Sequence, residues 1–197
     1  MCVFCCCFSL SLAGKLNIYL DTDLAPRWNA SVKANPLKNT DFILSTKQKI
    51  ALGIGAEYTD VIIDKLSYVA GGKYQFKRSF DTDSKTDYQM HLIYAQLLND
   101  LDLSFLPDGQ KLAAGIELNY SIQQGYKDSN FEDIKGGLGY ALFLAYNIDD
   151  ILLKAGYRSV NGQISTKKNG ANADKDNAYN FSNGFFIQAG YQFDLPF

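Results

Sequence analysis

The residues best suited to chemistry in this sequence are charged side chains that stand inside otherwise apolar segments. Five of them occupy alternate positions between apolar or small neighbours: Glu57, Lys73, Glu117, Lys154 and Arg158. A charge in a protein interior needs an oppositely charged partner or water, because removing it from water is costly. The five residues therefore predict an internal network of ion pairs, with the lining of a selective channel as the alternative.

The single histidine, His91, is the other residue that could take part in catalysis, since one histidine is enough for a triad. The sequence places neither Ser104 nor Ser121 near it. A lone histidine is also more often a hydrogen-bonded interior residue. We place His91 on the inward face of its segment and predict no catalytic residue and no enzymatic activity.

Metal and cofactor sites are not predicted either. The segment 81–87 begins like a calcium-binding loop, but Lys85 replaces a ligand, Thr86 replaces the glycine and Leu92 stands where the bidentate Glu belongs. The glycine clusters at 53–55 and 136–139 lack the strand-to-helix setting of a phosphate site. Charge is nearly balanced, with 19 Lys and Arg against 21 Asp and Glu, which gives no basic surface for nucleic acid.

The N-terminus predicts an export signal. An apolar run over 3–8 is followed by Ser11 and Ala13, small residues at the −3 and −1 positions of a signal-peptidase site. We therefore expect a signal peptide at 1–13 and one mature domain at 14–197 with no appended soluble domain, although no Lys or Arg precedes the apolar run. All four cysteines would leave with the signal, so the mature chain would have no disulfide and no cysteine-bound zinc.

The elements that must position the charged residues are eight runs in which apolar residues alternate with small or polar ones. Such runs predict antiparallel strands, and most are near the ~9–11 residues that a tilted strand needs to cross a bilayer. An even number of strands is what a single-chain bacterial barrel requires. We place the runs at 16–20, 50–58, 66–76, 88–94, 112–120, 138–146, 151–157 and 185–193.

The connections between the runs fall into two classes. Those at 59–65, 98–110 and 147–150 are mostly short, whereas those at 21–48, 77–87, 123–135 and 161–183 are generally longer and more polar. Outer-membrane barrels show this asymmetry between periplasmic turns and surface loops. Trp28, Ala30 and Val32 could form an extra strand segment, so ten strands is the alternative to eight.

The two faces of the runs indicate lipid rather than water outside. Residues between the apolar positions are mainly small or polar, as in Lys111–Ala113–Gly115–Glu117, which suits the narrow interior of an eight-stranded barrel. A soluble barrel would point its apolar residues inward instead. Tyrosine and phenylalanine also cluster at the ends of the outward series, where aromatic girdles form. The predicted fold is an all-β, transmembrane, antiparallel up-and-down β-barrel.

The C-terminal run resembles the last strand of bacterial outer-membrane barrels. Those strands carry a polar residue, a glycine two positions later and then alternating hydrophobic residues that end in an aromatic one. This sequence has the same pattern, apart from Pro196, at Gln188, Gly190, Phe193, Leu195 and Phe197.

The chain is thus similar to the superfamily that includes the OmpA transmembrane domain, OmpX, OmpW and the neisserial opacity proteins of Gram-negative bacteria. The resemblance implies a monomer in the cell outer membrane, in contact with lipid and lipopolysaccharide. It also implies that these five residues of the last strand, from Gln188 to Phe197, form the signal read by the barrel-assembly machinery.

Two functions follow as expectations. The first is a structural or surface-interaction role, adhesin-like, in which the loops 21–48 and 161–183 contact a host or another cell-surface ligand. The alternative is a small passive channel for small or hydrophobic solutes, as the resemblance to OmpW implies. Lipid-modifying barrels form a third class, but in the deacylase pattern a serine follows the histidine by two residues, and here that residue is Ile93.

Overall fold

The computed structural model describes residues 14–32, 40–44, 50–76, 78–79, 87–124, 131–166 and 178–195. The predicted signal peptide at 1–13, the calcium-like segment from 81 to 86 and Phe197 lie outside these residues. Within the described part of the chain, no helix has the length and apolarity needed to span a membrane.

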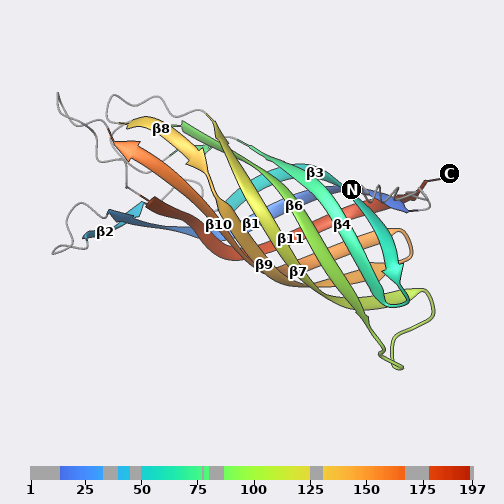
Figure 1. The fold of residues 1–197 in the computed structure, drawn as a ribbon. Coiled ribbons are helices and arrows are strands. Elements are labelled where there is room, and N and C mark those ends of the chain that lie inside the picture. The colour runs from blue at the N-terminus through green and yellow to red at the C-terminus, as the bar shows by residue number, and fades with distance from the viewer. Residues whose placement is uncertain are drawn as a thin grey trace, which may run out of the picture.

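Eight long antiparallel strands form one closed barrel (Figure 1). Each strand pairs with the next along this series, and the last strand pairs with both the seventh and the first, which closes the sheet. In chain order they are β1 (Lys15–Val32), β3 (Ile50–Ile63), β4 (Leu66–Gln75), β6 (Asp87–Leu101), β7 (Gln110–Gln124), β9 (Leu138–Ile148), β10 (Ile151–Thr166) and β11 (Ala178–Asp194).

Three shorter strands extend this wall without adding to the circuit. β2 (Thr40–Leu44) pairs with β1, and β5 (Arg78–Ser79) pairs with β6. β8 (Phe131–Gly136) is separated from β9 by Gly137 alone and pairs with β10, as β9 does. Because β8 and β9 continue one another along the barrel wall, the prediction of eight strands is confirmed and the alternative of ten is not.

The two ends of the barrel differ in their connections. At one end, which we call the turn end, Asp64 and Asp149 occupy tight turns with positive φ values of 37° and 52°, a conformation that aspartate tolerates better than most residues. β1 begins and β11 ends at this same end (Figure 1). β2 and β8 lie at the opposite end, which we call the long-strand end.

The outward face of the wall is apolar and exposed. Ile116, Leu142 and Ile187 have exposed fractions of 54%, 56% and 46%. A soluble protein does not present such a continuous apolar belt to water, whereas a lipid-facing strand alternates apolar residues outward with polar residues inward. The predicted polarity of the two faces is therefore confirmed for this wall.

The fourth run is an exception, because its predicted facing was wrong. We expected Met90, Leu92 and Tyr94 to point outward, but all three are buried inside the barrel, while Ile93 is exposed. Both faces of this strand are apolar, so alternation alone cannot choose between them. Gln96, which is buried in phase with Tyr94, could have indicated the inward face, because a buried amide needs hydrogen-bond partners.

Two of the predicted loops are also shorter than expected. β1 continues from Asp21 to Val32, so the segment around Trp28 belongs to β1 and forms no extra strand. Likewise β10 continues to Thr166, and β11 begins at Ala178. The strands therefore extend well into the ranges 21–48 and 161–183 that the sequence assigned to loops.

Candidate functional site

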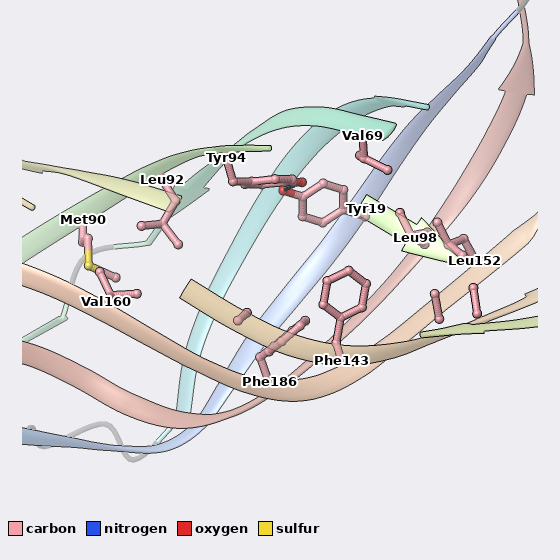
Figure 2. Packing of buried hydrophobic residues seen from close by; sticks show 13 residues of the cluster. Tyr19, Val69, Met90, Leu92, Tyr94, Leu98, Phe143, Leu152, Val160 and Phe186 are labelled. Carbon is pink, nitrogen blue, oxygen red and sulfur yellow. Dashed lines mark hydrogen bonds between the residues drawn. The ribbon is translucent and has the colours of Figure 1, made fainter. Parts of the chain in front are cut away.

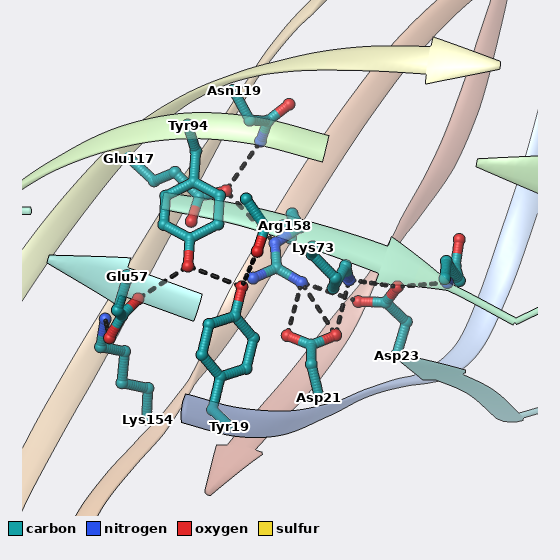
Figure 3. Close-up of polar contacts among 12 residues, drawn as sticks. Tyr19, Asp21, Asp23, Glu57, Lys73, Tyr94, Glu117, Asn119, Lys154 and Arg158 are labelled. Carbon is teal, nitrogen blue, oxygen red and sulfur yellow. Dashed lines mark hydrogen bonds and ion pairs between the residues drawn. The ribbon is translucent and has the colours of Figure 1, made fainter. Parts of the chain in front are cut away.

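The centre of the barrel holds a cluster of charges around one arginine. The Arg158 guanidinium donates to Asp21 at 3.0 Å, to Asp23 at 3.1 Å and to Glu117 at 3.3 Å. Lys73 Nζ lies 2.5 Å from Asp21 and 3.2 Å from Asp23. We call these five residues the arginine cluster (Figure 3). All five are buried, so each charge is compensated inside the lumen rather than by water.

A second cluster lies beside the first, nearer the turn end, around one lysine. Lys154 Nζ donates to Glu57 at 2.6 Å and to the Gln96 side-chain oxygen at 2.7 Å. Glu57 also accepts from the Tyr94 hydroxyl at 2.7 Å and from the Asn17 amide at 2.9 Å. Together with Tyr19, whose hydroxyl oxygen lies 2.7 Å from the Tyr94 hydroxyl oxygen, these residues form what we call the lysine cluster.

The two clusters are joined into one network. The Gln96 amide nitrogen donates to Glu117 at 2.7 Å, while its oxygen accepts from Lys154. Gln96 therefore uses both ends of its side chain to link the arginine cluster to the lysine cluster. Connected polar networks of this kind hold their members in one arrangement.

Aromatic rings fill the space that the charged groups leave. Phe186 lies against Arg158, with 3.9 Å from the guanidinium carbon to the ring centroid, and Phe143 lies 5.4 Å from Lys154 Nζ. Apolar side chains occupy the lumen on both sides of the network, with Met90 towards one end and Leu152 towards the other (Figure 2). The lumen is thus layered rather than uniformly polar.

Inward-facing glycines make room for these rings. A Cβ atom at Gly71 would lie 2.7 Å from the Tyr94 hydroxyl, and one at Gly55 would overlap the Tyr19 ring. A Cβ at Gly115 would likewise overlap the Phe143 ring. These glycines are needed for the close approach of a large neighbour, so each of the three is matched to one aromatic ring in the lumen.

The structure places all five sequence-predicted charged residues inside the lumen. It brings Glu57 together with Lys154, and Glu117 together with Arg158. Lys73 contacts none of the other four directly, and its partners are Asp21 and Asp23.

These two aspartates are the residues that the sequence analysis missed, because it ended the first strand at 20. The signal for them was present, since they continue the inward positions of Asn17 and Tyr19 at two-residue spacing.

His91 lies elsewhere than predicted. It is out of phase with the buried residues Met90 and Leu92 and stacks on the outward-facing Tyr74, with ring centroids 4.7 Å apart. The inward placement was therefore wrong, for the same reason that the facing of the whole fourth run was wrong. In the described part of the chain, no group of three histidine, cysteine, aspartate or glutamate residues could hold a metal ion.

Below the lysine cluster, the lumen opens at the turn end into a hollow of about 340 Å³. Of the lysine cluster, only Lys154 borders this hollow. Its inner wall is apolar, and its rim carries charged residues from the strand ends and turns. We call it the vestibule, and its apolar wall consists of Val69, Leu98, Ala113, Ala145 and Leu152.

Comparison with known proteins supports the fold but gives no close relative. No protein-family model matches the chain, and no curated protein sequence matches it. Among solved structures, the outer membrane protein AlkL in lipid bilayers matches with a TM-score of 0.61 and 11% identity, covering 94% of this chain and 92% of AlkL. The outer membrane protein OprG from Pseudomonas aeruginosa matches with a TM-score of 0.60 and 16% identity, covering 93% of this chain and 97% of OprG. The chain therefore has the fold of the bacterial outer-membrane β-barrels.

Proposed function

We propose that this protein is an integral barrel of the bacterial outer membrane that is closed to solutes and acts at the cell surface through its long-strand end. In this proposal the wall contacts lipid and lipopolysaccharide, the turn end faces the periplasm, and the role is structural or adhesin-like. A partner would be a host surface or another cell-surface ligand. The observation that carries the proposal is the network in the lumen.

The network supports a closed lumen because its members span the barrel from several strands. Asp21 on β1 is held by Arg158 on β10 at 3.0 Å, and Glu57 on β3 is held by Lys154, also on β10, at 2.6 Å. Opening a path would leave at least one buried charge without its partner, which is costly. An eight-stranded interior is also just wide enough to be filled by side chains.

The long-strand end supports a surface role. β1, β10 and β11 all continue past the network, and β2 pairs with β1 at that end. A rigid extension of the wall would hold the connecting segments away from the membrane, where a partner could reach them. We propose no enzymatic role.

A small passive channel remains the second candidate, and the vestibule is the observation that favours it. A hollow of about 340 Å³ already occupies the turn-end part of the lumen. A channel would need the network and the apolar layer that contains Met90 and Leu92 to rearrange. In that case the residues of the arginine cluster would control which solutes pass.

Conductance in planar bilayers separates the two candidates. A closed barrel gives no discrete conductance steps, whereas a channel gives steps whose size changes when Lys73 is replaced by Met. The matched control is Leu142→Met on the lipid-facing wall, which should leave either behaviour unchanged. Steps in the unaltered protein that respond to Lys73→Met would contradict the closed lumen.

The surface role is tested by shortening the segments 33–39 and 167–177 in separate variants. Each variant should still show different electrophoretic mobility before and after boiling, which reports a folded barrel. Bacteria that display a shortened variant should adhere less to epithelial cells than bacteria that display the full protein. Equal adhesion by every variant would count against the surface role.

We also propose that β11 carries the signal for barrel assembly. Gln188 is buried in the lumen, Phe193 is exposed on the lipid face, and Leu195 N donates to Gly14 O at 3.1 Å. This strand closes the barrel, so its recognition would couple insertion to closure. Replacing Phe193 by Ser should lower the amount of folded protein in the outer membrane, while Phe185→Ser, elsewhere on the same lipid face, should lower it less.

A further inference from the structure

The vestibule has the size and lining of a small-molecule pocket. A barrel that is closed by its central network would not require such a hollow. Its volume is about 340 Å³, which corresponds to roughly ten water molecules at ~30 Å³ each. Binding pockets for small ligands begin at this size and combine apolar walls with a few polar groups. Val69, Leu98 and Leu152 supply apolar walls that are nearly fully shielded from solvent.

At the rim of the vestibule, more acidic than basic side chains lack an ion-pair partner among the described residues. Lys15 lies 3.6 Å from Asp194, and Lys111 lies 3.8 Å from Asp100, so both rim lysines are already paired. In the described residues, Asp149 has no ion pair.

Asp64 likewise has no ion pair among the described residues. Its neighbour Lys65 is held by Asp102, and that hydrogen bond raises the pKa of Lys65. Three carboxylates, those of Asp60, Asp64 and Asp149, therefore border the vestibule without an ion pair among the described residues. Asp60 accepts hydrogen bonds from the Tyr58 hydroxyl and the Val61 amide, so the carboxylates of Asp64 and Asp149 are the more available of the three.

The inner end of the vestibule does not favour an anion, although a lysine lies there. Lys154 Nζ already donates to Glu57 at 2.6 Å and to Gln96 at 2.7 Å. Its positive charge is balanced by the buried Glu57 carboxylate. A ligand would therefore meet unpaired negative charge at the rim, and charge that is already balanced at the inner end.

We propose that the vestibule binds small amphipathic cations of about ten non-hydrogen atoms. The apolar body of the ligand lies against Val69, Leu98 and Leu152, and its protonated amine lies at the rim near Asp64 and Asp149. The rim is open to water, so the charge contributes selectivity of about twofold to fivefold per carboxylate, and added salt weakens it.

The test uses three matched probes that share one phenyl group: 2-phenylethylamine, 2-phenylethanol and phenylacetate. The full chain is placed in lipid nanodiscs, and methyl NMR signals are followed as each probe is added. We expect the amine to bind more tightly than the alcohol, and the alcohol more tightly than the carboxylate. The shifts should be confined to methyl groups of the vestibule, with Met90 and Leu92 on the far side of the network unaffected.

Two sets of variants identify the site. Asp64→Asn and Asp149→Asn keep a residue that tolerates positive φ, and together they should remove the preference for the amine over the alcohol. Asp108→Asn, an exposed residue outside the vestibule, is the matched control and should preserve that preference. Ala145→Phe fills the hollow and should abolish binding of all three probes, while boiled and unboiled samples verify that the barrel still folds.

Three outcomes would overturn the proposal. One is that phenylacetate binds most tightly, which would mean that Lys154 selects the ligand. Another is that the shifts persist in folded Ala145→Phe or appear equally on the lipid face, which would mean that the probes only partition into the membrane. The third is that no probe shifts the vestibule methyl groups at all.

Discussion

The centre of the lumen and the lipid-facing wall are built from the same strands under different constraints. On β10, the inward residues Lys154 and Arg158 are each tied to specific partners by ion pairs of 2.6–3.3 Å. The outward residues Leu153 and Tyr157 on that strand are 37% and 38% exposed and face the surroundings of the barrel. An inward position is thus specified by its partner, whereas an outward position is specified mainly by being apolar.

The physical reason lies in the medium on each side. Lipid tails offer no hydrogen bonds and no shape to match, so many apolar side chains serve equally well on the wall. The lumen is narrow and excludes water at its centre, so each buried charge needs its own counter-charge and hydrogen bonds. Substitutions inside should therefore cost more than substitutions outside, and they should depend on what happens to the partner.

Replacing Arg158 by Met should give the largest effect. Three carboxylates, on Asp21, Asp23 and Glu117, would lose a direct cationic partner. We expect the free energy of unfolding to fall by about 5 kcal/mol, the upper end of the range for breaking a buried pair. Urea unfolding from lipid vesicles, followed by the mobility of unboiled samples, measures it. Leu142→Met on the wall is the control, and an equal loss in both variants would remove the distinction between lumen and wall.

Replacing Lys154 by Met should give the next largest effect, about 3–4 kcal/mol of lost stability. Glu57 would keep only neutral donors, from Tyr94 and Asn17. The double variant Lys154→Met/Glu57→Gln removes both charges and should recover about 1–3 kcal/mol of that loss. The same urea titration compares the single and double variants. If the double variant were as unstable as the single one, the loss of stability would come from packing rather than from an unpaired buried carboxylate.

Alanine substitution at two adjacent glycines, one inward and one outward, should change stability by smaller amounts and compares the two faces of one strand directly. A Cβ atom at the inward Gly71 would lie 2.7 Å from both Glu57 and the Tyr94 hydroxyl, whereas at the outward Gly72 the nearest atom would be 3.4 Å away. Gly71→Ala should cost about 1–3 kcal/mol through overpacking, and Gly72→Ala should change stability by less than about 1 kcal/mol. Thermal loss of the unboiled band compares the two variants, and equal midpoints would show that the lumen can relax around an added methyl group.

The sequence predicted the wall more securely than the site. Outward series such as Ile116 and Leu118 were read correctly because their inward neighbours, Glu117 and Asn119, are polar. The prediction for the fourth run failed because both faces of the strand are apolar, with Leu92 on one and Ile93 on the other. The buried amide that marks the inward face, Gln96, lies beyond the predicted run. Asp21 and Asp23 failed for a different reason, since two aspartates after an apolar run also fit a loop.

What the sequence by itself determined is the alternation of apolar and polar positions, and with it a barrel with lipid outside and charges inside. Alternation is a local property, because successive side chains of a strand point to opposite faces. The choice of partners was decided only by the tertiary structure. Glu57 meets Lys154 across 97 positions, and Asp21 meets Arg158 across 137. Such pairs depend on the register and closure of the whole barrel, which no single segment encodes.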